Sequence, residues 1–348
     1  MIWLVSESEM DFSLLPEDTI EIFLLLSVTN AIHLKVFRLT NKIFRKIIIK
    51  LIRDEKITIP ISNKCEWTAL HGHLNLLRWA RQNECPWDSA TCSGAALNGH
   101  LEVLKFARRE KCPWTSATCS NAALNGHLEV LKWAHEKGCS MNKNTCSGAA
   151  LNGHLEVLKW ARENNCPWNS LVCSNAALNG HLGILKWARA NGCEWNTWTC
   201  SRAALNGHLK ILKWARKNDC EWNKFTCESA AKNGHFEVLK WARKTGCEWD
   251  EETCAMAARY GHLKVLQWAR TNGCPWDERT CSNAAFNGHI AVLKWARENN
   301  CPWNEDTSAS ATYGDHLEVL EWVLDNGCLC NDTTLYVISQ KWPHLLKL

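Results

Sequence analysis

Apolar and polar positions repeat along most of the chain with a period of 27 residues. Each copy carries a Gly-His pair, and in the last copy we interpret Asp315 as an insertion between the two. The repeating histidines are His73, His100, His127, His154, His181, His208, His235, His262, His289 and His316. A period of this length predicts a solenoid or a propeller, and the helical spacing of the apolar residues within each copy selects the solenoid.

Each copy is predicted to form two short antiparallel helices. The first begins at Thr91, whose side chain suits an N-cap, and ends at Gly99, where glycine readily adopts a left-handed conformation. The second runs from Leu101 to about Lys111, with apolar residues spaced three and four apart. Two such helices cannot bury their apolar sides alone, so neighbouring copies must stack. The predicted fold class is all-α.

Two segments of the unit resemble ankyrin repeats. Asn191–Asn196 reads N-G-C-E-W-N, similar to the ankyrin N-G-A-D-V-N, and Ala203–Leu209 reads A-A-L-N-G-H-L, similar to A-A-x-x-G-H-L. Ankyrin units have about 33 residues, about six more than these copies. The missing residues would lie where ankyrins project a β-hairpin finger. The resemblance implies an ankyrin-like helical solenoid of about ten short-fingered repeats, similar to the cysteine- and tryptophan-rich arrays of giant DNA viruses. We assign this array to residues 60–328 and a C-terminal cap to residues 329–348.

The array is predicted to begin irregularly. We interpret Cys65-Glu66-Trp67 as a linker, and His73 then follows too soon for a complete first helix. This interpretation leaves the first copy without most of its first helix, and residues 43–57 would dock in its place.

Residues 1–59 lack the repeat and resemble an F-box, a small helical module. The family pattern begins with Leu-Pro and continues with spaced apolar residues. The pattern positions that the resemblance marks as adaptor-binding are Leu15, Pro16, Ile22 and Leu26. The resemblance implies binding to the Skp-type adaptor of a cullin-based ubiquitin ligase. The alternative is a plain helical cap that shields the open end of the solenoid.

Cysteine and tryptophan are unusually frequent, with 20 and 21 residues among 348. Equivalent cysteines in stacked repeats are expected about 8–10 Å apart, beyond the roughly 7 Å limit for a disulfide. No closely spaced C-x2-4-C pairs suggest zinc either. We therefore expect free buried thiols, no metal and no cofactor. The histidines are expected to brace the turns between helices, and the tryptophans to pack in the core.

The charge pattern does not favour nucleic acid as a partner. The net charge is only +4, and the lysines and arginines along the second helices often follow a glutamate by three residues, as on a solvated ridge. The longest apolar run, Ile20–Val28, has nine residues and is too short to span a membrane. The first residues lack the basic region of a signal peptide. A cytoplasmic protein is expected, in the host-cell cytoplasm if the chain is viral.

No arrangement of residues predicts catalysis, because each repeat contains the same Cys and His and none stands out. The sequence therefore predicts a non-enzymatic protein-protein interaction adaptor. The F-box resemblance implies a substrate-recruiting subunit of a cullin-based ubiquitin ligase. The alternative is an ankyrin-repeat binding scaffold without any ubiquitin link.

The target site is predicted where the repeats differ from one another. In the shortened finger, three consecutive copies carry a large apolar residue at one position, and the first helices that follow carry substitutions at their ends. The predicted target-binding residues are Leu171, Trp198, Phe225, Lys232, Arg259, Tyr260 and Phe286. The alternative is that Trp198 and Phe225 only cover a neighbouring linker tryptophan.

Overall fold

The computed structural model describes residues 64–82 and 84–347. All regular secondary structure in this part of the chain is helical, so the predicted all-α class is confirmed. No helix in these residues is both long and apolar enough to cross a membrane. The F-box-like module lies outside the described residues. So do its four predicted adaptor-binding positions, Leu15, Pro16, Ile22 and Leu26.

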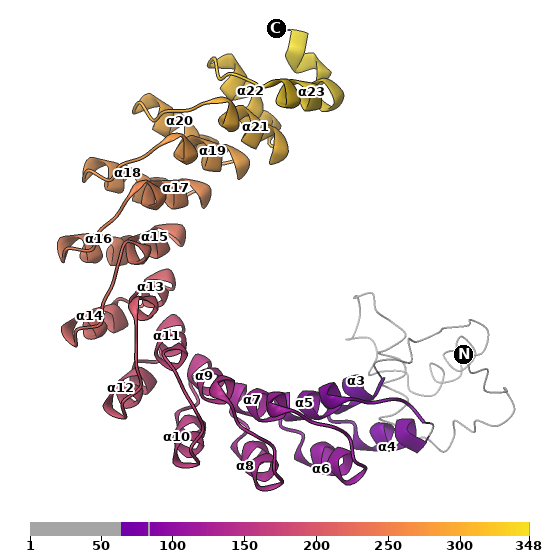
Figure 1. Ribbon diagram of the computed structural model, residues 1–348. Coiled ribbons are helices and arrows are strands. Elements are labelled where there is room, and N and C mark those ends of the chain that lie inside the picture. Colours follow the sequence, from indigo (N-terminus) through magenta and orange to yellow (C-terminus); the bar gives the residue numbers. More distant parts are fainter. Residues whose placement is uncertain (1–63, 83, 348) are drawn as a thin grey trace, which may run out of the picture. The chain divides into compact units, whose positions relative to one another are not determined.

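The described residues form ten pairs of short helices, as expected for about ten repeats (Figure 1). The first helices of the pairs are α3 (Lys64–Leu70), α5 (Ser89–Leu97), α7 (Ser116–Leu124), α9 (Lys143–Leu151), α11 (Leu171–Leu178), α13 (Thr197–Leu205), α15 (Phe225–Lys232), α17 (Glu251–Arg259), α19 (Glu278–Phe286) and α21 (Glu305–Tyr313). The second helices are α4 (Leu74–Gln82), α6 (Leu101–Arg109), α8 (Leu128–Glu136), α10 (Leu155–Glu163), α12 (Leu182–Ala190), α14 (Leu209–Lys217), α16 (Phe236–Lys244), α18 (Leu263–Thr271), α20 (Ile290–Glu298) and α22 (Leu317–Asp325). The chain closes with α23 (Asp332–Lys341) and the 3-10 helix η3 (Pro343–Lys347).

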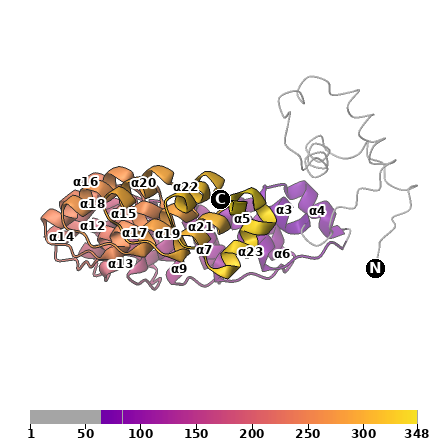
Figure 2. The ribbon, with the colours of Figure 1, turned by 90° about the horizontal axis from the view of Figure 1, so that it is seen from above.

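The chain divides into two compact units. The first extends to Ala122 and includes Glu129–Ser140, and the second contains Ala123–Leu128 and everything from Met141 onward. In the second unit each first helix from α9 to α21 packs against the next, and α23 packs against α21. Figure 1 shows these first helices on one side of the unit and the second helices on the other, and in Figure 2 the pairs from α15 to α22 overlap in projection.

The core of each repeat consists of small residues on the first helix and branched residues on the second. In the α13/α14 repeat, Ala203 and Ala204 lie opposite Ile211 and Leu212, and all four are at most 2 % exposed. Small side chains let consecutive first helices approach closely, while burial of a leucine contributes about 1.5–3 kcal/mol. The repeated alternation of small and large residues therefore explains why the units stack.

Most first helices begin three residues earlier than the sequence analysis predicts, and α11 and α15 begin two residues earlier. Asp88, not Thr91, is the N-cap of α5, and its Oδ1 accepts a hydrogen bond from the backbone N–H of Ala90 at 2.8 Å. Thr91 is fully buried inside the first turn. The prediction was wrong because Thr and Asp both suit an N-cap, and the path of the linker places Asp88 at that position. The linker Cys85-Pro86-Trp87 leads directly into this N-cap.

Two irregularities at the ends of the array also differ from expectation. Cys65 lies in α3, one period before Cys92, so the first copy has a first helix after all, although a short one. Asp315 is a substitution and not an insertion: it adopts the left-handed conformation (φ 62°) that glycine has elsewhere. The glycine has moved to position 314, where a Cβ would lie 2.2 Å from the carbonyl oxygen of Phe286.

The repeating histidines brace the turns between repeats, as predicted. His208 Nε2 lies 3.0 Å from the carbonyl oxygen of Leu178, at the end of the preceding first helix. Its ring also covers Gly180, where a Cβ would come within 2.9 Å of the imidazole. A positive φ of 83° and this close ring both require glycine at position 180. The same contact between ring and glycine recurs in the second unit from His154 to His316, so these histidines fix the turn of the repeat before them.

The tryptophans form half-buried pairs and do not fill the core. Trp195 of the linker meets Trp214 of α14 edge to face, with ring centroids 5.8 Å apart. Arg189 lies over the Trp195 ring at 4.2 Å and donates a hydrogen bond to the carbonyl oxygen of Cys193. Both rings keep part of their surface in solvent. The repeated Arg-Trp-Trp groups therefore lie between each linker and a second helix, where they cover the linker.

Cysteines 20 residues apart pair within every described repeat except the last, where Ser308 replaces the helix cysteine, and all of them are free thiols. Cys200 of α13 and Cys220 of the following linker are both fully buried free thiols, and Cys200 Sγ lies 4.0 Å from the carbonyl oxygen of Cys220. A hydrogen bond to Cys220, together with burial, raises the pKa of Cys200. The two cysteines of a pair are 20 residues apart in the sequence. The sequence analysis considered only cysteines at equivalent positions of neighbouring repeats, and therefore did not predict this contact.

Candidate functional site

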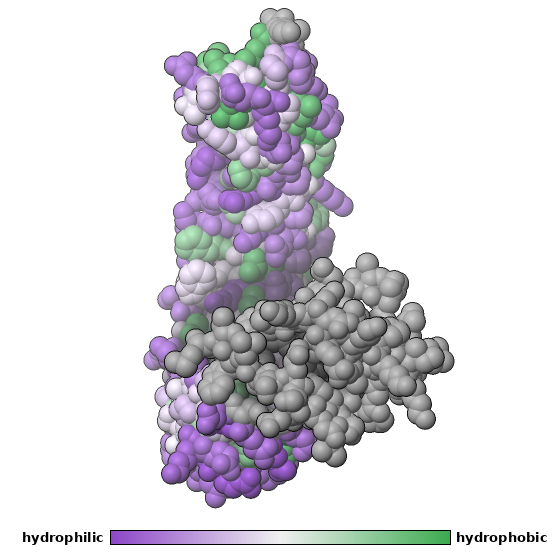
Figure 3. Space-filling model, turned by 90° about the vertical axis from the view of Figure 1, so that its right-hand side faces the viewer, coloured by the Kyte–Doolittle hydropathy of each residue, from purple (hydrophilic) through white to green (hydrophobic). Residues whose placement is uncertain are grey.

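The candidate site lies on the first-helix face, by which we mean the exposed surface of α11 to α21 in the second unit. Leu171, Trp198 and Phe225 occupy the first turns of α11, α13 and α15, with 37 %, 57 % and 45 % of their surface exposed. The rings of Trp198 and Phe225 lie parallel within 6°, with centroids 6.3 Å apart. Figure 3 faces this side of the second unit and shows apolar residues as separate patches in a hydrophilic surface.

The start of α13 explains why Trp198 projects into solvent. Asn196 caps the helix, with its Oδ1 accepting a hydrogen bond from the backbone N–H of Trp198 at 3.2 Å. The next two residues, Thr199 and Cys200, point inward and are fully buried. The linker tryptophan Trp195 pairs with Trp214 instead. The recorded ring contact of Trp198 is thus with Phe225, another exposed side chain.

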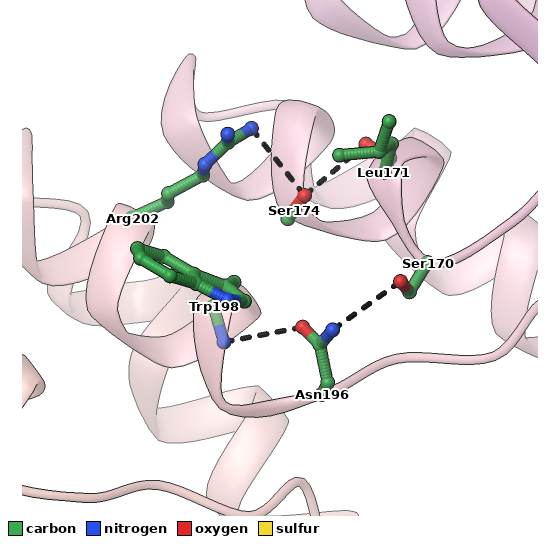
Figure 4. Close-up of a pocket in the computed structure, with 6 residues that line it drawn as sticks. All are labelled: Ser170, Leu171, Ser174, Asn196, Trp198 and Arg202. Carbon is green, nitrogen blue, oxygen red and sulfur yellow. Dashed lines mark hydrogen bonds between the residues drawn. The ribbon is translucent and has the colours of Figure 1, made fainter.

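An open hollow of about 240 Å³ lies between the first turns of α11 and α13 (Figure 4). Its walls are Ser170, Leu171, Ser174, Asn196, Trp198 and Arg202. Arg202 lies one turn after Trp198 and donates hydrogen bonds to Ser174 Oγ at 3.4 Å and to Asn175 Oδ1. Both acceptors are neutral, so these bonds fix the guanidinium without neutralising its charge.

A carboxylate lies on the other side of the aromatic pair. Glu228 is one turn after Phe225 on α15, and its Oε1 is buried without a hydrogen-bond partner. Burial and the neighbouring carboxylates of Asp250 and Glu252, opposed by Lys224, raise the pKa of Glu228 to about 7. Lys224 forms an ion pair with Asp250, with 2.5 Å between Nζ and Oδ2.

The remaining predicted residues lie at the opposite ends of the first helices. Lys232, Arg259 and Phe286 are the last residues of α15, α17 and α19. Tyr260 caps α17, is 42 % exposed, and has Lys232 Nζ 5.4 Å from its ring centroid. In earlier repeats an asparagine at this position joins adjacent repeats, as Asn206 Nδ2 does with the carbonyl oxygen of Leu178 at 2.8 Å. Tyrosine replaces that bond with a cation–π contact.

The structure therefore places the predicted residues in two groups. Leu171, Trp198 and Phe225 form one group at the N-terminal turns, and the other group lies at the C-terminal turns. At 1.5 Å per residue, helices of eight or nine residues separate the two groups by roughly 12 Å. The first group is continuous across three repeats, whereas the second begins on α15 and continues toward α21.

Three residues of this face were not predicted. Tyr313 ends α21 one period after Phe286 and is 58 % exposed. Arg202 and Glu228 replace the asparagine, serine or glycine that most other first helices carry at the same positions. All three departures are visible when the copies are aligned at their 27-residue period. Arg202 and Glu228 were missed because only the finger positions and the ends of the first helices were compared, and Tyr313 was missed because the comparison of helix ends stopped at Phe286.

No group of three or more His, Cys, Asp or Glu side chains in the described residues is arranged to hold a metal ion. The face instead offers aromatic rings, the unneutralised guanidinium of Arg202 and the partly buried carboxyl group of Glu228. These groups suit non-covalent recognition of another chain.

Neither a protein-family model nor a curated protein matches the chain. A solved structure that is similar is the ankyrin repeat domain of human ASB11, with 17 % identity over 45 % of this chain and 84 % of that domain, and a TM-score of 0.38. The repeat architecture therefore rests on the ten helix pairs of the described residues.

Proposed function

We propose that the chain is a non-enzymatic scaffold that binds a protein target on the first-helix face. The observation that carries the proposal is the stacked pair of Trp198 and Phe225, which remains about half exposed. Large aromatic side chains supply a disproportionate share of binding energy at protein interfaces. An aromatic pair fixed on a rigid stack of helices loses little conformational freedom when a partner covers it.

The test uses the full chain as bait for its target in a cell lysate. Trp198→Ala combined with Phe225→Ala should weaken target capture by about 2–4 kcal/mol and change the melting temperature little, because both rings are on the surface. Tyr260→Ala measures separately whether the C-terminal group contributes. A double variant that binds normally but melts much earlier would show that the rings stabilise the fold and that the site lies elsewhere.

The F-box resemblance supports a finer version of this proposal. In that version Leu15, Pro16, Ile22 and Leu26 bind a Skp-type adaptor, and the target is presented to a cullin-based ubiquitin ligase in the cytoplasm, of the host cell if the chain is viral. Leu15→Ala with Pro16→Ala should then abolish co-precipitation of the Skp-type protein while target capture persists. The alternative is the scaffold without a ubiquitin link, which predicts no Skp-type protein in precipitates of the intact chain.

A further inference from the structure

The aromatic pair on the first-helix face lies between two opposite charges. Arg202 is on the same side of α13 as Trp198, four residues later, and its guanidinium reaches back to Ser174 and Asn175 at α11. Glu228 is on the same side of α15 as Phe225, three residues later. The face therefore presents, in order from α11 to α17, a cation, two stacked rings and a carboxyl group.

Neither charge is paired within the described residues. The recorded partners of Arg202 are a hydroxyl and an amide oxygen, and no ion pair to Glu228 is recorded in this part of the chain. The neighbouring ions are paired with each other: Lys224 with Asp250, and Arg279 with Glu252 at 2.7 Å. Burying a polar oxygen without a hydrogen-bond partner destabilises the fold. An incoming donor at Glu228 removes that destabilisation.

We propose that this face binds an extended segment of a partner protein that carries an acidic residue, an apolar residue and a basic residue in that order along the surface. This inference rests on the proposed function and specifies the chemistry of the target. The partner's carboxylate pairs with Arg202 in the hollow beside Leu171. Its apolar side chain covers Trp198 and Phe225, and its ammonium or guanidinium group donates to Glu228.

The repeat spacing sets the distance between the two charges of the partner. Adjacent packed helices are roughly 8–10 Å apart, so the hollow between α11 and α13 and the carboxyl group between α15 and α17 are about two such spacings apart. An extended chain rises about 3.3 Å per residue. The acidic and basic residues of the segment are therefore about five or six positions apart, with the apolar residue between them.

The experiment is a selection of random peptides displayed on phage, with the intact chain as bait. The wild-type chain should enrich peptides that carry this acidic–apolar–basic order, and Trp198→Ala should weaken their binding about tenfold or more. Arg202→Glu should remove the acidic residue from the selected peptides and leave the basic one. Glu228→Arg should do the opposite. Matched controls are Lys186→Glu and Glu237→Arg, exposed charge reversals on the second helices α12 and α16, which should leave the selection unchanged.

The outcomes separate this inference from the proposed function. The inference is overturned if the selected peptides depend on Trp198 but show no acidic–apolar–basic order. It is also overturned if they keep this order with both Arg202→Glu and Glu228→Arg. Either outcome leaves the proposed function standing. A selection in which no enriched peptide depends on Trp198 or Phe225 overturns both. Circular dichroism of every variant checks folding, and Glu228→Gln, which removes the charge without reversing it, should abolish the preference for a basic residue.

Discussion

Packing changes the chemistry of individual side chains on the first-helix face and inside the stack. Glu228 is enclosed on α15 beside two other carboxylates, and burial with Asp250 and Glu252 raises its pKa to about 7. The cysteines are enclosed at the junction of helix and linker, where hydrogen bonding and burial raise the pKa of helix thiols such as Cys173. At this scale the surroundings of each side chain set its pKa.

The raised pKa of Glu228 predicts how the fold responds to pH. A carboxyl group that titrates near 7 when folded and near 4.3 when unfolded binds more protons in the folded state between these values. Stability is therefore lost as the pH rises through this window. Glu228→Gln should raise the melting temperature at pH 8 and lose this advantage at pH 4. Melting curves at both values check this, with the exposed Glu237→Gln as a control that should show no such difference.

The cysteines predict a large difference in thiol reactivity between folded and unfolded chain. All 20 lie in the described residues, and Cys330 alone among them is only partly buried. A thiol reagent should modify Cys330 first in the native chain and reach close to 20 thiols after denaturation under reducing expression conditions. One or more equivalents of bound zinc, or several thiols missing from the denatured count, would contradict this picture.

At the scale of single elements, the N-caps decide where the first helices start. Asn196 Oδ1 accepts from the N–H of Trp198, and Asn196 Nδ2 donates to Ser170 Oγ of the preceding repeat at 3.3 Å. One side chain therefore both starts α13 and connects it to the repeat before it. The direction in which Trp198 points depends on that start.

Replacing this cap should weaken the fold measurably. Asn196→Ala should destabilise the chain by about 1 kcal/mol, because it removes the N-terminal hydrogen bond of α13. Asn196→Asp keeps the acceptor and should retain most of the stability. Chemical denaturation of the three proteins measures the difference. Equal stability of the alanine variant and the wild type would show that the linker positions α13 without its cap.

The sequence suffices to predict the helix pairs and their stacking, but not the helix starts or the directions of side chains, which depend on backbone geometry. The 27-residue period and the apolar spacing within it suffice to predict helix pairs and stacking, because these depend on burial alone. Thr91 was mistaken for a cap because Thr and Asp both suit that position, and only the chain path selects Asp88. Arg202 and Glu228 could be recognised as unusual, but their separation around Trp198 and Phe225 depends on side-chain directions that no sequence pattern contains.

At the scale of the whole molecule, consecutive repeats in each unit contact mainly their neighbours, so a complete period should be removable. Deletion of residues 251–277 takes out α17, α18 and their linkers and brings α15 into register with α19. The shortened chain should keep the same helicity per residue, measured by circular dichroism. Deletion of residues 251–264 removes about half a period and serves as the control. It should unfold the following repeats, and equal folding of both deletions would contradict a stack in strict register.

The exposure of Trp198 also gives the molecule an optical marker of its own. Every other tryptophan in the described residues is at least partly covered, and most linker tryptophans carry an arginine over the ring, as Arg216 does at 4.4 Å from Trp222. Among the tryptophans of residues 64–347, Trp198 should therefore emit at the longest wavelength and be quenched first by acrylamide. Excitation at the red edge of the absorption band would then favour this side chain over those others, and a blue shift would follow when a partner excludes water from its ring.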